Sequence, residues 1–101
     1  MMDYDIEYGD TFMKRFKGLM LRRNIPDNYI FVLYPCKQVH GMFMLRDISL
    51  IVLNKEKVVI DKVEILKPWS ISKHYNYGYY MLELIDRKIY EAISIGDKVE
   101  I

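Results

Sequence analysis

The segment PCKQVHGMFM holds the only cysteine of the chain, Cys36, and the first of its two histidines, His40. A thiol and an imidazole catalyse nucleophilic reactions when sulfur and ring nitrogen lie within hydrogen-bond reach. Residues four apart are neighbours in a helix, but they lie about 13 Å apart in a strand at roughly 3.3 Å per residue. Pro35, Val39 and Gly41 disfavour a helix here. The segment therefore predicts a buried thiol and a hydrogen-bonded histidine rather than a catalytic pair.

Two alternatives for this segment stay open. One is a catalytic Cys–His dyad, and the other is a metal site completed by His74, Asp47 or Glu83. No CxxC or HxxxH spacing supports a metal site. We therefore expect no metal and no other cofactor, and we favour a protein without catalytic residues over an enzyme.

The stretch PWSISKHYNYGYY concentrates aromatic side chains between two expected strands. Tyrosines gathered in a loop offer rigid contact area with both apolar and polar parts, as in many binding surfaces. Packing of this loop over the core is the alternative. We expect a small ligand or a peptide to bind here, at one end of the fold. The predicted ligand-binding residues are His40, Met44, Trp69, His74, Tyr75, Tyr77 and Tyr79.

Charged and turn-forming residues give three further candidates. Segment 10–23 carries five basic residues and one acidic residue, which suits either a phosphate-contacting helix or, as we favour, a solvated helix face. Arg22 could pair with the carboxylate of Glu83 or Asp97. Gly96 and Asp97 predict a turn, because glycine tolerates positive φ and aspartate bonds to nearby backbone.

The hydrophobic pattern that must position these residues is mainly β. It predicts a compact antiparallel β-sandwich or barrel of about six to seven strands, with one short helix near the N-terminus, inside residues 10–23. Strand 58–66 changes the parity of its apolar positions near Asp61, which predicts a β-bulge or a change of sheet. The segments expected to be extended are 1–8, 29–34, 39–44, 48–53, 58–66, 79–85 and 96–101, and a short helix is expected in 86–93.

Length and composition set the class of protein. The 101 residues make one domain, 1–101, and 51% of them are hydrophobic. The net charge of +1 gives no general attraction to nucleic acid or to anionic membranes. The single cysteine and the acidic start without an apolar run predict a cytoplasmic location. We expect a monomer or a weak homodimer.

The chain resembles the small proteins of domain of unknown function family 192. Three blocks carry the resemblance: KRFKGLMLR, YPCKQVHGMFMLRDISLIVLN, and the region from LKPW through MLEL to IGDKVEI. The chain departs from the family pattern at Gly41, Ser49 and Ile85. The resemblance implies a compact, mostly antiparallel β fold and supplies no activity. The matching residues are Gly18, Leu19, Met20, Arg22, Pro35, Cys36, Val39, His40, Met44, Ile48, Pro68, Trp69, Leu82, Glu83, Leu84, Gly96 and Asp97.

Three classes of function follow from these patterns. Binding of a small ligand or peptide at the aromatic end predicts a groove with few convergent titratable groups. An enzyme or metal site built on Cys36, His40 and a carboxylate predicts titratable groups in contact, with perturbed pKa values. A structural or accessory subunit predicts a large exposed apolar patch. We favour the first class.

Overall fold

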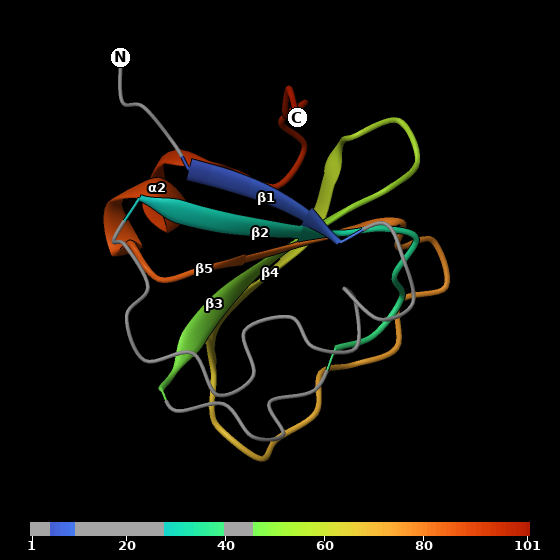
Figure 1. Cartoon of the computed structure of the whole chain (residues 1–101). Helices are drawn as coiled ribbons and strands as arrows, with labels where there is room; N and C mark the ends of the chain where they lie inside the picture. The colour runs from blue at the N-terminus through green and yellow to red at the C-terminus, as the bar shows by residue number, and fades with distance from the viewer. Residues whose placement is uncertain (1–4, 10–27, 40–45) are drawn as a thin grey trace.

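Five strands and one short helix make up the regular structure of residues 5–9, 28–39 and 46–101, which the computed structural model describes (Figure 1). The mainly β prediction and the short helix near residue 90 are confirmed. The predicted helix within 10–23 and the extended segment 40–44 lie outside the described residues. The elements are β1 (Asp5–Gly9), β2 (Tyr29–Leu33), β3 (Ile48–Leu53), β4 (Val59–Leu66), β5 (Tyr80–Leu84) and α2 (Arg87–Ala92).

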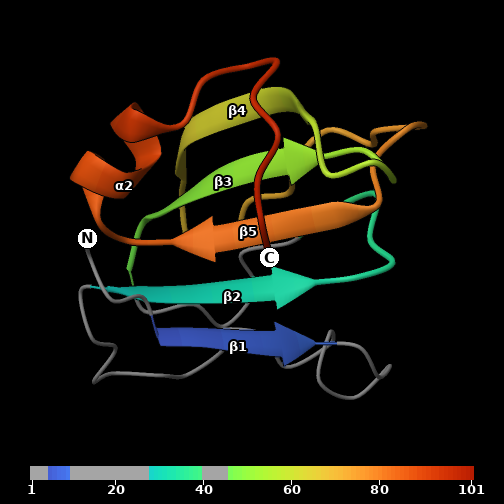
Figure 2. The same cartoon turned by 90° about the horizontal axis from the view of Figure 1, so that it is seen from above.

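All five strands belong to one sheet with the order β1-β2-β5-β3-β4 (Figure 2). β1 pairs with β2 in parallel, whereas the other neighbours are antiparallel. The sheet is therefore mixed, and the expectation of an antiparallel fold is wrong for its first pair. β1 and β4 form its two edges, so the described part of the chain shows an open sheet and neither a closed barrel nor a second sheet. The strand expected in 96–101 is reduced to one bridge, between Val58 and Lys98.

Both faces of the sheet are covered, which explains the continuous apolar run of β3. All six of its residues are buried, and they alternate between the two faces. Helix α2 and the C-terminal segment cover one face (Figures 1 and 2). The core under them contains Ile30, Val32, Ile51, Leu53, Val59, Leu82, Leu84 and Ile89. The core of the opposite face contains Tyr29, Phe31, Leu33, Val39, Ile48, Leu50, Val52, Leu66 and Met81.

The parity change in β4 is a β-bulge, as predicted. Leu53 pairs with Val59, but Val52 pairs with Asp61, so Ile60 is an extra residue in the ladder. A second register shift lies nearer the C-terminal end of the strand. Val59 packs on the α2 side and Ile60 on the opposite core, as successive strand residues do. The bulge places Asp61 on the face covered by the loops.

Two loops on that face, 34–39 after β2 and 67–79 before β5, are joined by backbone hydrogen bonds. These bonds run from Cys36 N to Tyr79 O (2.9 Å), from Tyr75 N to Lys37 O (2.8 Å) and from Ser72 N to Val39 O (2.9 Å). Since each loop satisfies backbone groups of the other, the pair forms a fixed layer over the core. This layer positions the aromatic residues between Trp69 and Tyr79.

Candidate functional site

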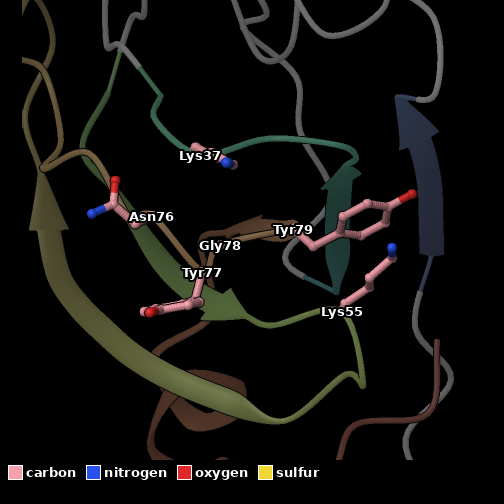
Figure 3. Close-up of a pocket in the computed structure, with 6 residues that line it drawn as sticks. All are labelled: Lys37, Lys55, Asn76, Tyr77, Gly78 and Tyr79. Atoms are coloured by element: carbon pink, nitrogen blue, oxygen red, sulfur yellow. The ribbon is translucent and has the colours of Figure 1, made fainter.

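A pocket of about 250 Å³ opens where the aromatic loop meets the end of the sheet (Figure 3). Figure 3 shows Asn76 and Tyr77 projecting to one side of it, and Tyr79 and Lys55 on the other. Its volume is slightly below the roughly 300–1,000 Å³ that is typical of pockets for drug-sized ligands. It therefore suits a small molecule or one end of a longer chain. The described lining residues are Lys37, Lys55, Asn76, Tyr77, Gly78 and Tyr79.

Three chain segments bring these residues together. Lys37 comes from the loop after β2, and the aromatic residues come from the loop that leads into β5. Tyr79 is anchored at the end of β3, because its backbone N–H donates to the carbonyl of Leu53 (2.9 Å). The pocket is thus built on backbone that is hydrogen-bonded to the sheet.

The β3–β4 hairpin loop supplies Lys55. Its shape is fixed by the side chain of Asn54, whose Oδ1 accepts hydrogen bonds from the backbone N–H groups of Glu56 and Val58, both at 3.0 Å. Asparagine favours such turns because its amide replaces a backbone acceptor. Lys57 closes the loop with a positive φ of 67°. The loop therefore holds the backbone of Lys55 at the edge of the pocket.

Gly78 is required by a tight turn within its own loop, in which its backbone N–H donates to the carbonyl oxygen of Tyr75 (3.0 Å). A Cβ atom at this position would lie 3.0 Å from the Cβ of Tyr75, 3.2 Å from the Tyr75 carbonyl oxygen and 3.4 Å from the carbonyl oxygen of Cys36. Two of these three neighbours are backbone atoms, which move only if a loop moves. A larger residue would thus strain the turn between Tyr75 and Gly78, while its contact with the Cys36 carbonyl of the other loop would be an ordinary one.

Tyr75, although predicted to be part of the ligand site, points to a different place. Its hydroxyl donates a hydrogen bond to Oδ2 of Asp61 on β4 (2.6 Å). Burial, the hydrogen bond to Asp61 and the negative charge of that carboxylate together raise the pKa of Tyr75 to about 12. A phenol with a raised pKa keeps its proton near neutral pH, so it is a poorer general base than free tyrosine. The pair is suited to holding the loop on the sheet.

A second depression, of about 560 Å³, lies beside this pair, along the edge strand β4. Its walls are formed by β4 on one side and by the 71–75 segment on the other. Carboxylates, lysines and aliphatic side chains all line it. The described lining residues are Asp61, Lys62, Val63, Glu64, Ile65, Leu66, Ile71, Ser72, Lys73 and Tyr75.

The remaining predicted site residues are separated. Trp69 is 64% exposed, has a positive φ of 65° and lies in a turn whose Ser70 N–H donates to the carbonyl of Lys67 (3.2 Å). His74 is exposed. Neither lines the pocket of Figure 3 or the second depression. His40 and Met44 lie outside the described residues. Of the five predicted ligand-binding residues that the structure describes, the pocket therefore unites Tyr77 and Tyr79.

Cys36 is half-buried against the core of the loop-covered face. Its thiol donates to the carbonyl oxygen of Gln38 (3.2 Å). His40, its proposed partner, lies outside the described residues, so the dyad stays a hypothesis. Among the described residues, no group of three or more His, Cys, Asp or Glu side chains is placed to hold a metal ion.

The other residues of the resemblance have varied environments. Glu83 is 4% exposed in the central strand, in register with Phe31 and Leu50. Gly96 and Asp97 form a turn, as predicted: Gly96 has a φ of 96°, and the Asp97 carboxylate accepts from the Ser94 N–H (2.8 Å). Gly18, Leu19, Met20 and Arg22 lie outside the described residues.

Ser49, one of the departures from the family pattern, is buried on β3. Its hydroxyl donates to the carbonyl oxygen of Glu64 on the neighbouring strand (2.7 Å). A serine here therefore supports the pairing of two strands. It does not line either depression.

Lys37, Lys55, Asn76 and Gly78 line the pocket but were not among the residues predicted from the sequence. Asn76 and Gly78 alternate with the tyrosines in the loop, so the aromatic stretch as a whole would have found them. The two lysines gave no usable signal, because a lysine in a polar loop looks the same whether it lines a pocket or is only solvated.

Comparisons with known proteins identify relatives but no activity. The model of the DUF192 family, described as "Uncharacterized ACR", matches residues 2–101. A UPF0127 protein of Pyrococcus furiosus is 36% identical over 95% of this chain and 85% of its own length. A UPF0127 protein of Pyrococcus abyssi is 36% identical over 94% of this chain and 84% of its own.

The same fold is found among solved structures. An example is the crystal structure of a protein of unknown function from Novosphingobium aromaticivorans, with a TM-score of 0.84 and 19% sequence identity. The match covers 97% of this chain and 75% of that one. At this level of identity, the likeness shows the fold alone.

Proposed function

The chain belongs to the DUF192 family, as its sequence blocks predicted, and we propose that it is a non-enzymatic binding protein whose pocket at the aromatic end takes a small ligand or a peptide end. The observation that carries this proposal is the pocket of Figure 3, in which Tyr77 and Tyr79 meet side chains from two other loops. Concave sites with aromatic walls and a few convergent polar groups are typical of ligand binding.

The exposure of Tyr77 supports the proposal. This side chain is 83% exposed, and the described residues provide no hydrogen bond to its hydroxyl. A large aromatic ring in that position adds little to the core, but it offers contact area at low entropic cost. Tyr79 is more buried, and its ring packs edge-to-face on Tyr80, with centroids 4.8 Å apart. The pocket thus combines a fixed ring with an accessible one.

The titratable groups described so far support binding over catalysis. Tyr75 and Asp61 are in contact, but the raised pKa of Tyr75 stabilises its protonated form and does not produce a reactive base. The lysines of the pocket make no contact with a histidine, cysteine or carboxylate among the described residues. Neither the Tyr75–Asp61 pair nor the two pocket lysines therefore combine a nucleophile with a base.

Binding is tested by titrating uniformly ¹⁵N-labelled protein with a library of small aromatic fragments of mixed charge. We expect at least one fragment to shift the backbone amides of residues 76–79 and of the loops around 37 and 55. Tyr77→Ala should weaken that fragment by roughly 5- to 30-fold, in line with about 1–2 kcal/mol for a contacting tyrosine. Ile95→Ala is the matched control, because Ile95 is similarly exposed (62%) and lies outside the pocket.

Two results would contradict the proposal. The first is that no fragment shifts the backbone amides around the pocket, either because the shifts lie elsewhere on the protein or because there are none. The second is a Tyr77→Ala variant that binds as tightly as the unmodified protein. Both variants should keep the thermal midpoint of the parent, because neither side chain is buried. Loss of folding in Tyr77→Ala would show that this ring belongs to the core.

A further inference from the structure

The pocket at the aromatic end is lined by more hydrogen-bond donors than acceptors. Every polar side chain that lines it can donate a hydrogen bond: two ammonium groups, two phenol hydroxyls and one amide. Among its described lining residues there is no carboxylate. A ligand that donates would find few acceptors there, whereas a ligand that accepts would find donors from three segments of the chain.

The ammonium groups of the two pocket lysines have no partner among the described residues, as is also true of Lys98 but not of Lys57 or Lys62. Lys57, two residues after Lys55 in the same hairpin loop, donates to the carbonyl oxygen of Ile101 (2.9 Å). Lys62 lies 4.0 Å from the centroid of the Tyr90 ring. Lys37 and Lys55 come from separate loops and line the same pocket without such contacts. Their positive charges are therefore available to a ligand.

The aromatic walls set the rest of the ligand's character. The rings of Tyr77 and Tyr79 offer apolar surface and π-faces against which a planar or aliphatic group packs. The pocket volume of about 250 Å³ leaves room for one such group and one charged head. Gly78 lies between the two tyrosines without a side chain, which leaves the floor of the pocket as backbone.

We propose that the pocket binds an anionic head group, a carboxylate or a phosphate, between Lys37 and Lys55, with an apolar group of the same ligand against Tyr77 and Tyr79. This inference rests on the proposed binding function and names the chemical class of its ligand. A lysine ammonium is a point charge and accepts both kinds of anion. The source of the anion, a carboxylic acid or a phosphate ester, is decided by experiment.

The test uses four probes that share one ring and differ in the head group: phenylacetate, phenyl phosphate, phenylacetamide and phenethylamine. Each is titrated into ¹⁵N-labelled full-length chain, and the dissociation constant is taken from amide shifts of residues 76–79. We expect at least one of the two anions to bind about fivefold or more tightly than the neutral amide, and the cation to bind most weakly. The stronger anion identifies the source.

Lysine variants locate the effect. Lys37→Gln and Lys55→Gln should each weaken the anion by about two- to fivefold, the range for exposed ion pairs, and leave phenylacetamide unchanged. Lys98→Gln is the control, since Lys98 is exposed and outside the pocket. In the unmodified chain, raising the salt concentration from about 0.01 M to 1 M should remove most of the preference for the anion, because the screening length falls from roughly 30 Å to 3 Å.

The outcomes separate the two proposals. If phenylacetamide binds in the pocket as tightly as both anions, the anion inference fails and the binding function stands. If the anions bind but neither lysine variant nor salt weakens them, the placement between Lys37 and Lys55 is wrong. If none of the four probes shifts residues 76–79, and the wider fragment library does not do so either, both proposals fail.

Discussion

At the residue scale, Tyr75 differs from the other tyrosines of its loop because its hydroxyl is committed to Asp61. From the sequence, all the tyrosines of that loop looked equivalent. What separates them is the bulge at Ile60, which turns Asp61 toward the loop-covered face. Sequence alone could indicate the bulge from the parity of β4, but not which tyrosine would meet the carboxylate, since this contact depends on the path of the loop.

The Tyr75–Asp61 bond should give a pH-dependent contribution to stability. The pKa of Tyr75 is raised from 10.0 to about 12 in the folded chain, so the folded state holds this proton more tightly than the unfolded state. The contribution is therefore complete below about pH 10 and is lost as the pH rises through 12. The free energy of unfolding, measured by urea titration, should differ between the parent and Tyr75→Phe by about 0.5–1.5 kcal/mol near neutral pH.

The difference in the free energy of unfolding between the parent and Tyr75→Phe should become smaller as the pH rises from 9 to 12. Lysines also titrate in this range, but their effect is shared by the two proteins and cancels in the difference. A constant difference across this range would mean that Tyr75 does not hold its proton through Asp61 and burial.

Gly78 makes a second prediction at this scale. Gly78→Ala should lower the free energy of unfolding by about 1–3 kcal/mol, because the added methyl group would lie too close to the Cβ and the carbonyl oxygen of Tyr75 in the same turn. The matched control is Gly96→Ala. There φ is 96° and the space for a Cβ is open, so only backbone strain of about 1–2 kcal/mol is expected.

The two glycine variants differ most in their effect on the pocket. Gly78→Ala should also change the amide shifts of Cys36 and Tyr79, whereas Gly96→Ala should leave them unchanged. Identical shifts at these two residues in Gly78→Ala and the parent would show that the turn from Tyr75 to Gly78 accommodates the methyl group without moving its neighbours.

At the element scale, the sequence predicted the strands that have clear apolar patterns, but it did not predict which strands pair with each other. The run ISLIVL predicted a strand buried on both faces, and β3 is such a strand. The parallel pairing of β1 with β2 could not be derived from local pattern, because a parallel pair depends on the crossover between its strands. The ending GDKVEI alternates like a strand, yet within it only Lys98 forms a bridge, with Val58 just before β4.

Helix α2 is short, so its stability depends on its cap and on Ile89. Oδ1 of Asp86 accepts a hydrogen bond from the backbone N–H of Lys88 (2.8 Å). The ion pair between Arg87 and Glu64 is exposed and should contribute little. Asp86→Ala should therefore cost about 0.5–2 kcal/mol, and Asp86→Ser much less.

Hydrogen exchange locates the effect of this cap. The amide of Tyr90, which donates to the Asp86 carbonyl (3.2 Å), should exchange faster in Asp86→Ala. Arg87→Gln serves as the comparison, with a change below about 0.5 kcal/mol. If Arg87→Gln proved the more damaging variant, the ion pair and not the cap would hold the helix.

At the scale of the whole molecule, the two cores share one sheet. Leu82 faces the α2 side and Met81 faces the loops, and they are adjacent residues of the same central strand. Within the sheet, the edge strands β1 and β4 are connected through the three strands between them, β2, β5 and β3. Because a change in one face moves the backbone on which the other is built, the described elements should fold as one cooperative unit rather than as two layers.

Cooperativity is tested by weakening each face separately. Phe31→Ala, on the loop-covered face, should cost about 3–5 kcal/mol, and Ile89→Ala, on the α2 face, about 2–5 kcal/mol, because both side chains are buried to 2% exposure or less. Unfolding in urea is followed by far-ultraviolet circular dichroism, which reports on the sheet and helix, and by fluorescence of Trp69, the single tryptophan, which lies in a loop.

If the two faces form one unit, the two signals coincide in the parent and in both variants, and only the midpoint moves. The sharper case is Ile89→Ala, because this residue is far from Trp69 in sequence and lies on the opposite face of the sheet. A shifted dichroism curve with an unchanged fluorescence curve would mean that α2 and its core melt alone. The loop-covered face, with the proposed pocket, would then be the independent part, and ligand binding would survive the loss of the helix. Coincident curves would instead require that every variant which weakens either core also lowers the fraction of protein able to bind.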